Sequence, residues 1–102
     1  MTQAPALSSY FDFKKAIPGW NINLERDTID REFIFTNFEC AFEFMGLCAK
    51  YAEKINHHPD WSNSWNKVNV RLSTHSMKTL TELDILMAQA MDRFAQQISL
   101  NA

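Results

Sequence analysis

The chain has 102 residues, of which 46% are hydrophobic and 13% aromatic, and its formal net charge is −2 with neutral histidines. This length supports one hydrophobic core, and therefore a single domain over residues 1–102, and the composition argues against a disordered chain. Lysine and arginine are scattered, so we expect no direct binding to nucleic acid, and no apolar run approaches the roughly 20 residues of a membrane span.

The N-terminal segment and the cysteines bear on location. MTQAPALSSYFDFKK has no basic start followed by an apolar stretch, so it does not resemble a secretory signal. Cys40 and Cys48 fall in a predicted helix, about 12 Å apart along its axis, which is too far for a disulfide. We therefore expect reduced thiols and a cytoplasmic protein, with a nuclear location left open.

The first predicted elements are a helix and a β-hairpin. Residues 8–17 place apolar side chains on one stripe of a helix that Ser8 or Ser9 caps and Pro18-Gly19 ends. Alternating apolar residues then predict strands at 20–24 and 29–35, on either side of the polar turn 25–27. The side chains expected to face the core are Tyr10, Phe13, Ile17, Trp20, Ile22, Leu24, Ile29, Phe33 and Phe35.

A long helix is predicted next. Thr36 and Glu39 have the spacing of a capping box, with Thr36 as N-cap, and the helix should stop at Asn56. Its apolar positions alternate at intervals of three and four: Phe38, Ala41, Phe42, Met45, Cys48, Ala49, Ala52 and Ile55. The helix therefore leads the chain to His57-His58-Pro59, where the proline restricts His58 to an extended backbone.

The remaining chain returns to strand and then to helix. From Trp61 the alternation resumes, and 66–67 is either the tight turn of a second hairpin over 61–72 or only a bend. In this segment Val68, Val70 and Leu72 face one way.

The final helix starts at Thr81, with Asp84 at its third position and Leu80 and Ile85 placed as a hydrophobic staple. Its apolar stripe is Leu83, Met87, Ala90, Met91, Phe94 and Ile98. The order α-β-β-α-β-β-α, with two hairpins and no crossover pattern, predicts an α+β fold: a four-stranded antiparallel sheet with helices packed on one face.

The three histidines, His57, His58 and His75, all follow the ends of predicted elements. Imidazole, with an ordinary pKa of about 6.5, can give or take a proton at neutral pH, and loops on a rigid scaffold often carry chemistry. Each candidate also has a structural explanation. The paired histidines suit a helix C-terminus, His75 a solvated loop, Asp84 the first turn of its helix, and Glu53 a surface ion pair with a lysine.

A metal site is a competing interpretation, because three histidines and a carboxylate would suit zinc or iron. Against it, His57 and His58 cannot use helical i, i+4 geometry, and the chain has neither HExxH nor a pair of neighbouring cysteines. Both cysteines lie on or beside the apolar stripe of a helix, which disfavours a cysteine nucleophile. We therefore expect no metal, and because the chain has only Gly19 and Gly46 and no glycine-rich phosphate loop, we expect no cofactor.

Together these residues resemble the signature of the pterin-4a-carbinolamine dehydratase family. The matching positions, in order, are Glu53, His57-His58-Pro59, Trp65, His75 and Asp84. The segments GW at 19–20, FxxAFxFM from residue 38, NKV and LSTH are also similar, so the resemblance covers residues 18–95.

The resemblance implies a homodimer or homotetramer that dehydrates 4a-hydroxytetrahydrobiopterin to quinonoid dihydrobiopterin, recycling the pterin used by aromatic amino-acid hydroxylases. His57, His58 and His75 would be the catalytic histidines and Asp84 their acidic companion. The implied pterin contacts are Glu53, His57, His58, Pro59, Thr74, His75, Ser76 and Trp20.

The sequence departs from the family pattern in the loop 76–80, which reads SMKTL where members often carry glycines, and this puts the contact from Ser76 in doubt. Leu83 stands where a charged residue is common. Animal members also bind a homeodomain transcription factor. The alternative function is therefore a non-catalytic module that stabilises a transcription-factor dimer.

Overall fold

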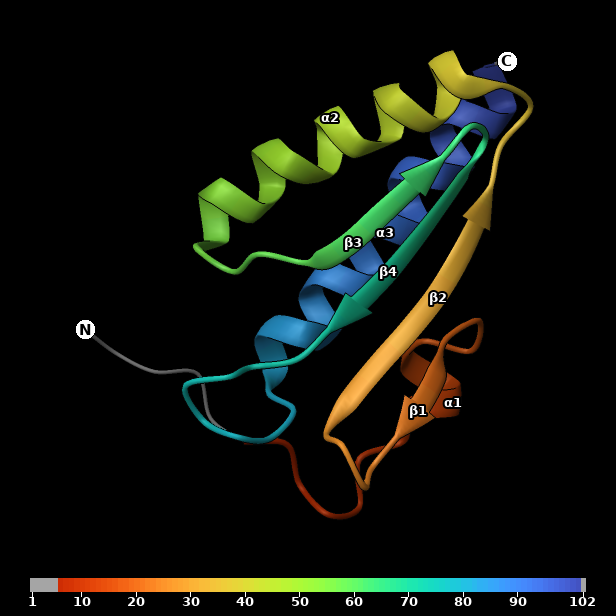
Figure 1. Ribbon diagram of the computed structural model, residues 1–102. Coiled ribbons are helices and arrows are strands. Elements are labelled where there is room, and N and C mark those ends of the chain that lie inside the picture. The colour runs from red at the N-terminus through yellow and green to blue at the C-terminus, as the bar shows by residue number, and fades with distance from the viewer. Residues whose placement is uncertain (1–5, 102) are drawn as a thin grey trace.

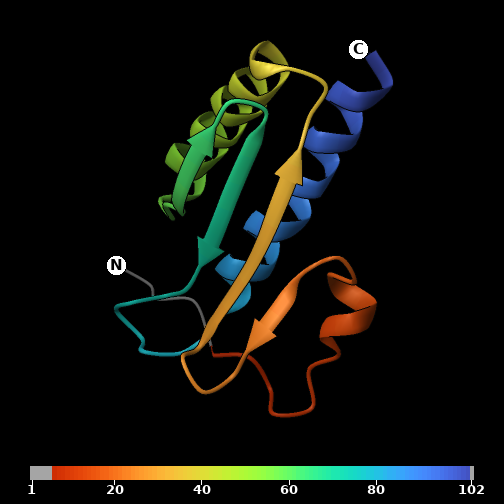
Figure 2. The ribbon, with the colours of Figure 1, turned by 45° about the vertical axis from the view of Figure 1, so that its right-hand side comes forward.

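The fold follows the predicted order of elements. A computed structural model describes residues 6–101, with α1 at Phe13–Ala16, β1 at Asn21–Asn23, β2 at Thr28–Ile34, α2 at Phe38–Ile55, β3 at Asp60–Ser64, β4 at Lys67–Leu72 and α3 at Glu82–Asn101. The strands form one antiparallel sheet in the order β1-β2-β4-β3. Helices α2 and α3 pack against each other and cover one face of this sheet (Figures 1 and 2). The predicted α+β fold is confirmed. Within residues 6–101 no helix is both long and apolar enough to cross a membrane.

The core lies between the sheet and the two long helices. Val68, Val70 and Leu72 of β4 are buried as predicted, because alternate residues of a strand face the same side. Phe33 of β2 pairs in register with Val68, and its ring lies 4.8 Å from that of Phe44 in α2. β3 and β4 form a second hairpin, so the hairpin alternative is the correct one, but its turn is at residues 65–66, one residue before the predicted 66–67, because Lys67 already pairs with Ser64.

Two predicted helix starts are wrong, because a side chain later in the sequence caps each helix: Asp12 caps α1 and Asn37 caps α2. α1 begins at Phe13, where Asp12 Oδ1 accepts a hydrogen bond from the N–H of Lys15 at 3.1 Å. Tyr10 therefore lies outside the helix and is 93% exposed. The N-cap of α2 is Asn37 and not Thr36, because Asn37 has the extended backbone and accepts from the N–H of Cys40 at 2.8 Å.

The buried face of α2 also differs from the prediction. Phe44 is fully buried, whereas Phe42 is 64% exposed and Phe38 is 47% exposed. The core stripe of the helix is Ala41, Phe44, Cys48 and Ala52. Apolar residues line two sides of this helix, so the spacing alone could not decide which side the sheet covers. Leu24 was likewise expected in the core but is 66% exposed, because β1 ends at Asn23.

Candidate functional site

The end of α2 turns the two neighbouring histidines to opposite sides. Asn56 adopts the left-handed conformation (φ 52°, ψ 48°), and the N–H of His57 donates to the carbonyl of Ala52 at 3.0 Å. This arrangement is a common helix ending. His57 then points inward and is 8% exposed, whereas the side chain of His58 is 56% exposed.

His57 contacts the start of α3. Its Nε2 lies 2.6 Å from Oδ1 of Asp84, a carboxylate that has no exposed surface. The second oxygen of Asp84 accepts from the hydroxyl of Thr74 at 2.8 Å and from the backbone N–H of Thr81 at 3.0 Å. A histidine from the end of α2 and a carboxylate from α3 therefore form a buried pair, in which both carboxylate oxygens have hydrogen-bond partners.

His58 forms a second pair on the outside of the molecule. Its Nε2 lies 2.5 Å from Oε2 of Glu53, whose side chain is 77% exposed. Glu53 is in the last turn of α2, one turn before the histidines. The two adjacent imidazoles thus each have a carboxylate partner, one buried and one in solvent.

His75 lies in the loop after β4. Its Nε2 is 3.4 Å from Oγ of Ser73, and the loop is closed by a bridge between Thr74 and Thr79. The residue is exposed. It lines a hollow of about 240 Å³ whose other wall is the β1–β2 turn; the lining residues are Arg26, Asp27, Thr28, Ser73, Thr74, His75, Lys78 and Thr79.

The structure brings some of the predicted site residues together and separates another. Thr74 connects the His57–Asp84 pair to the loop of His75, and Ser76 is exposed in that same loop. Trp20 lies elsewhere. It is buried, and its Nε1 donates to Oδ1 of Asp92 at 2.9 Å, about 12 Å along α3 from Asp84.

Trp20 belongs to a separate polar cluster. Arg31 Nη1 also donates to Asp92 Oδ1, at 2.8 Å, and its guanidinium lies 4.7 Å from the centre of the Phe33 ring. Burial raises the pKa of Asp92, although the hydrogen bonds and charges of its neighbours act in the opposite direction. Burial also raises the pKa of the Cys48 thiol to about 12. Within residues 6–101, neither Asp92 nor Cys48 forms a hydrogen bond with a histidine.

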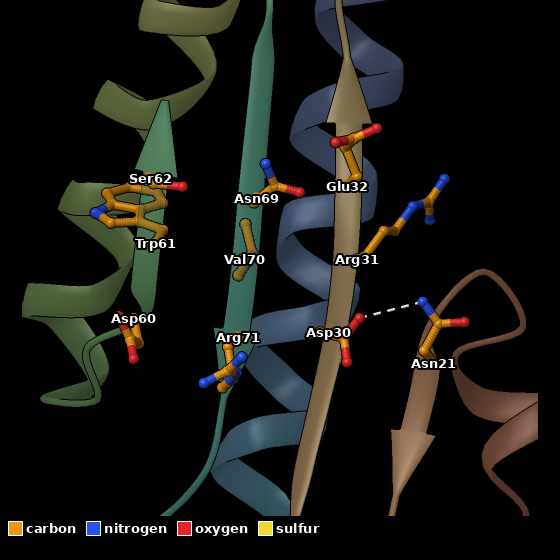
Figure 3. Close-up of a pocket in the computed structure, with 10 residues that line it drawn as sticks. All are labelled: Asn21, Asp30, Arg31, Glu32, Asp60, Trp61, Ser62, Asn69, Val70 and Arg71. Atoms are coloured by element: carbon orange, nitrogen blue, oxygen red, sulfur yellow. Dashed lines mark hydrogen bonds between the residues drawn. The ribbon is translucent and has the colours of Figure 1, made fainter. Parts of the chain in front are cut away.

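A larger hollow, of about 500 Å³, lies on the open face of the sheet away from the helices. Figure 3 shows Asp30, Arg71 and Asp60 in neighbouring strands along this face, with Asn21 donating to Asp30. Its lining within the described residues contains no histidine. We therefore regard the smaller hollow as the more relevant one for a histidine-based site, because His75 lines it together with Thr74, which contacts Asp84.

Sequence reasoning did not find Thr81 as a member of the site. It was recognised only as the start of the final helix, yet its hydroxyl lies 2.7 Å from that of Thr74. The same reasoning missed Arg26, Asp27 and Lys78, which line the hollow of His75. Between residues 6 and 101, no group of three or more His, Cys, Asp or Glu side chains is arranged to hold a metal ion.

Comparisons with known proteins point to one family. Residues 4–94 match the family model described as pterin 4 alpha carbinolamine dehydratase. A protein of Rhizorhabdus wittichii, provisionally named a pterin-4-alpha-carbinolamine dehydratase, is 45% identical over 85 residues, which are 83% of this chain and 88% of that protein. A protein of Brucella ovis with the same provisional name is 48% identical over 81 residues, which are 79% and 84% of the two chains.

A solved structure is also similar. It is the crystal structure of a protein from Brucella melitensis described as a transcriptional coactivator/pterin dehydratase. The TM-score is 0.81 and the sequence identity 42%, and the match covers 89% of this chain and 99% of the other.

Proposed function

Because the chain belongs to the pterin 4 alpha carbinolamine dehydratase family, we propose that it dehydrates 4a-hydroxytetrahydrobiopterin to quinonoid dihydrobiopterin. The observation that carries the proposal is the buried His57–Asp84 pair, joined through Thr74 to the loop of the exposed His75. His57 precedes β3 and His75 follows β4, and because the start of β3 pairs with the end of β4 the two imidazoles come from different elements at the same end of the sheet. One can then serve as the acid and the other as the base.

The protein needs to supply only proton transfers in this reaction. The C4a–O bond breaks as the N5 lone pair forms the C4a=N5 bond, and a general acid protonates the departing oxygen, which leaves as water. A ring N–H then loses its proton to a general base, and no electrons pass to or from another molecule. One histidine of the His57/His58 pair and His75 divide these two roles.

The magnitude of such catalysis is moderate. A positioned general acid or base typically accelerates a reaction by ~10²–10⁴-fold, which corresponds to about 2.7–5.4 kcal/mol of the activation barrier. Replacing His75 by alanine should therefore lower the rate by about this factor. The other histidine and its carboxylate should still bind and orient the pterin.

The test is the absorbance decay of freshly generated 4a-hydroxytetrahydropterin in buffer, with wild type, with His75→Ala and with Arg71→Ala. We expect rapid decay with wild type, a large loss with His75→Ala and little change with Arg71→Ala, which alters only the open face of the sheet. Equal decay in buffer and wild type would refute the activity. A loss with Arg71→Ala alone would move the chemistry to the hollow of Figure 3.

We further propose that the chain forms a homodimer or homotetramer. Phe38 and Phe42 on the outer side of α2 are both largely exposed, with ring centroids 5.8 Å apart, so they offer an apolar surface to a second copy. Light scattering should show a smaller particle for Phe42→Glu than for Lys50→Glu, an exposed control on the same helix. Equal masses would contradict this surface.

We also propose a cytoplasmic location, because Cys40 and Cys48 are free thiols.

The second candidate function is a protein-binding module that stabilises a transcription-factor dimer. The coactivator description of the Brucella melitensis protein and the same exposed apolar surface of α2 favour it. His75→Ala separates the two functions, because a catalytic role predicts loss of dehydration with unchanged binding to a partner. Phe42→Glu should weaken binding to a partner and leave dehydration unchanged.

A further inference from the structure

A single line of hydrogen bonds runs from the first turn of α3 to His57. The backbone N–H of Leu83 donates to Oγ1 of Thr81 at 3.2 Å, and Thr81 Oγ1 lies 2.7 Å from Oγ1 of Thr74. Thr74 Oγ1 donates to Oδ2 of Asp84 at 2.8 Å, and Asp84 Oδ1 lies 2.6 Å from Nε2 of His57. We call this series the threonine chain.

The hydrogens of the threonine chain can be arranged in only one way when Asp84 is a carboxylate. A hydroxyl has one hydrogen, and Thr74 uses its hydrogen on Asp84. The hydrogen between the two threonines must therefore belong to Thr81, whose oxygen in turn accepts from the N–H of Leu83. Both oxygens of Asp84 then act as acceptors, so the nitrogen of His57 that faces them must carry a hydrogen.

We propose that Thr74 and Thr81 are positioning residues that hold the hydrogen of His57 on Nε2, which leaves Nδ1 as the nitrogen that exchanges a proton with the substrate. A neutral imidazole has one donor and one acceptor nitrogen, so assigning the donor also assigns the acceptor. The catalytic part of this inference rests on the proposed dehydratase function. The assignment of the hydrogens does not.

Burial makes the arrangement persistent. Asp84 and Thr81 have no exposed surface, Thr74 is 6% exposed and His57 is 8% exposed. Water therefore cannot replace a missing hydroxyl easily, and alternative partners are few. The inference also changes the role of Thr74. Its hydroxyl hydrogen is used on Asp84, so it orients the carboxylate and is not available as a donor to the pterin.

The first test is the nitrogen-15 NMR spectrum of wild-type protein at a pH where His57 is neutral. The expected result is a hydrogen on Nε2 and a lone pair on Nδ1. A hydrogen on Nδ1 would overturn the assignment. This measurement needs no variant and no activity, so it separates a failure of the threonine chain from a failure of the proposed function.

The second test concerns catalysis. Thr74→Val removes the donor to Asp84 and should lower kcat by at least about tenfold, as a disturbed imidazole tautomer does in other acid–base enzymes, with little change in KM and an altered pH profile. Thr74→Ser and Thr81→Ser keep the hydroxyls, so both variants should have a kcat close to that of wild type. Thr36→Val, an exposed threonine at the opposite end of the sheet, is the control. A Thr74→Val protein with the kcat and pH profile of wild type would overturn the positioning role.

Discussion

Thr81 and Asp84 are joined by two hydrogen bonds in opposite directions. The N–H of Thr81 donates to Oδ2 of Asp84 at 3.0 Å, and the N–H of Asp84 donates to the carbonyl of Thr81 at 3.1 Å. This reciprocal pattern stabilises the start of a helix. The same carboxylate therefore has two roles. Its Oδ1 contacts His57, and its Oδ2 accepts from the N–H of Thr81 and so stabilises the start of α3.

Replacing Asp84 by asparagine should destabilise the protein. Both oxygens of the carboxylate accept hydrogen bonds inside the core, and an amide offers only one acceptor, so one buried donor loses its partner. Such a loss costs about 1–3 kcal/mol of unfolding free energy. Glu82→Gln, in the same first turn but exposed, removes an equal charge and should cost less than about 0.5 kcal/mol. Urea unfolding measures both, and equal losses would contradict the buried role.

The two glycines should respond to alanine with opposite signs. A Cβ at Gly19 would lie 2.5 Å from Nη1 of Arg31, so the guanidinium must move away from Asp92. That ion pair is about one-third exposed, and we expect a loss of only about 0.5–1 kcal/mol. Gly46 in α2 has no atom within 4 Å of the added Cβ, and alanine there should stabilise by about 0.5–1 kcal/mol. Thermal unfolding of the two variants is the measurement, and shifts of the same sign would contradict it.

The alternation of β4 and the C-terminal end of α2 were predictable from local chemistry, whereas the starts of α1 and α2 were not. Val68, Val70 and Leu72 alternate with polar residues. When only one face of a sheet is covered, this alternation determines which side chains of the strand are buried. Asn56 ends α2 as expected, because asparagine tolerates the left-handed conformation. The buried side of α2 was not predictable. Phe42 and Phe44 are both apolar, and only the packing of α2 on the sheet decides that Phe44 is inside.

Several side chains of the candidate site were named from the sequence, but Thr81 and the contacts between the side chains were not. The neighbouring histidines and Asp84 were identified from the sequence, yet 27 residues separate His57 from Asp84 and no local rule connects them. The hydroxyl contact between Thr74 and Thr81 likewise depends on the loop that returns from β4 to α3. Hydrogen bonds between distant segments follow from the whole fold, and spacing in the sequence does not contain them.

The stability contribution of Asp92 should depend on pH. Burial raises its pKa above the ordinary value of 3.8, so the folded state holds this proton more tightly than the unfolded state does. The contribution is therefore fully present below pH 3.8 and is lost as the pH rises through the folded pKa. Urea unfolding of wild type and Asp92→Asn across this range should show the stability of wild type, relative to the variant, falling as the pH rises. A relative stability that increases with pH would contradict the sign.

The two cysteines should differ in reactivity. Cys48 is fully buried and its pKa is raised to about 12, so almost no thiolate is present at pH 8, whereas Cys40 is half-buried. Iodoacetamide should therefore modify native wild type at Cys40 only. A Cys40→Ser variant isolates Cys48 and should be labelled only after urea is added, as measured by mass spectrometry. Labelling of this variant in its native state would show that Cys48 is accessible.

The loop that carries His75 should become more stable when Lys78 is replaced by glycine. Lys78 has a φ of 52°, a left-handed conformation that costs a residue with a Cβ about 1–2 kcal/mol, and its N–H donates to the carbonyl of His75 at 3.2 Å. Glycine removes that cost but adds freedom to the unfolded chain, so the net gain should be about 0.5–1 kcal/mol. Lys78→Ala keeps the strain and loses the charge, so it should stay within about 0.5 kcal/mol of wild type. If urea unfolding found Lys78→Gly no more stable than Lys78→Ala, the backbone of this loop would not be strained.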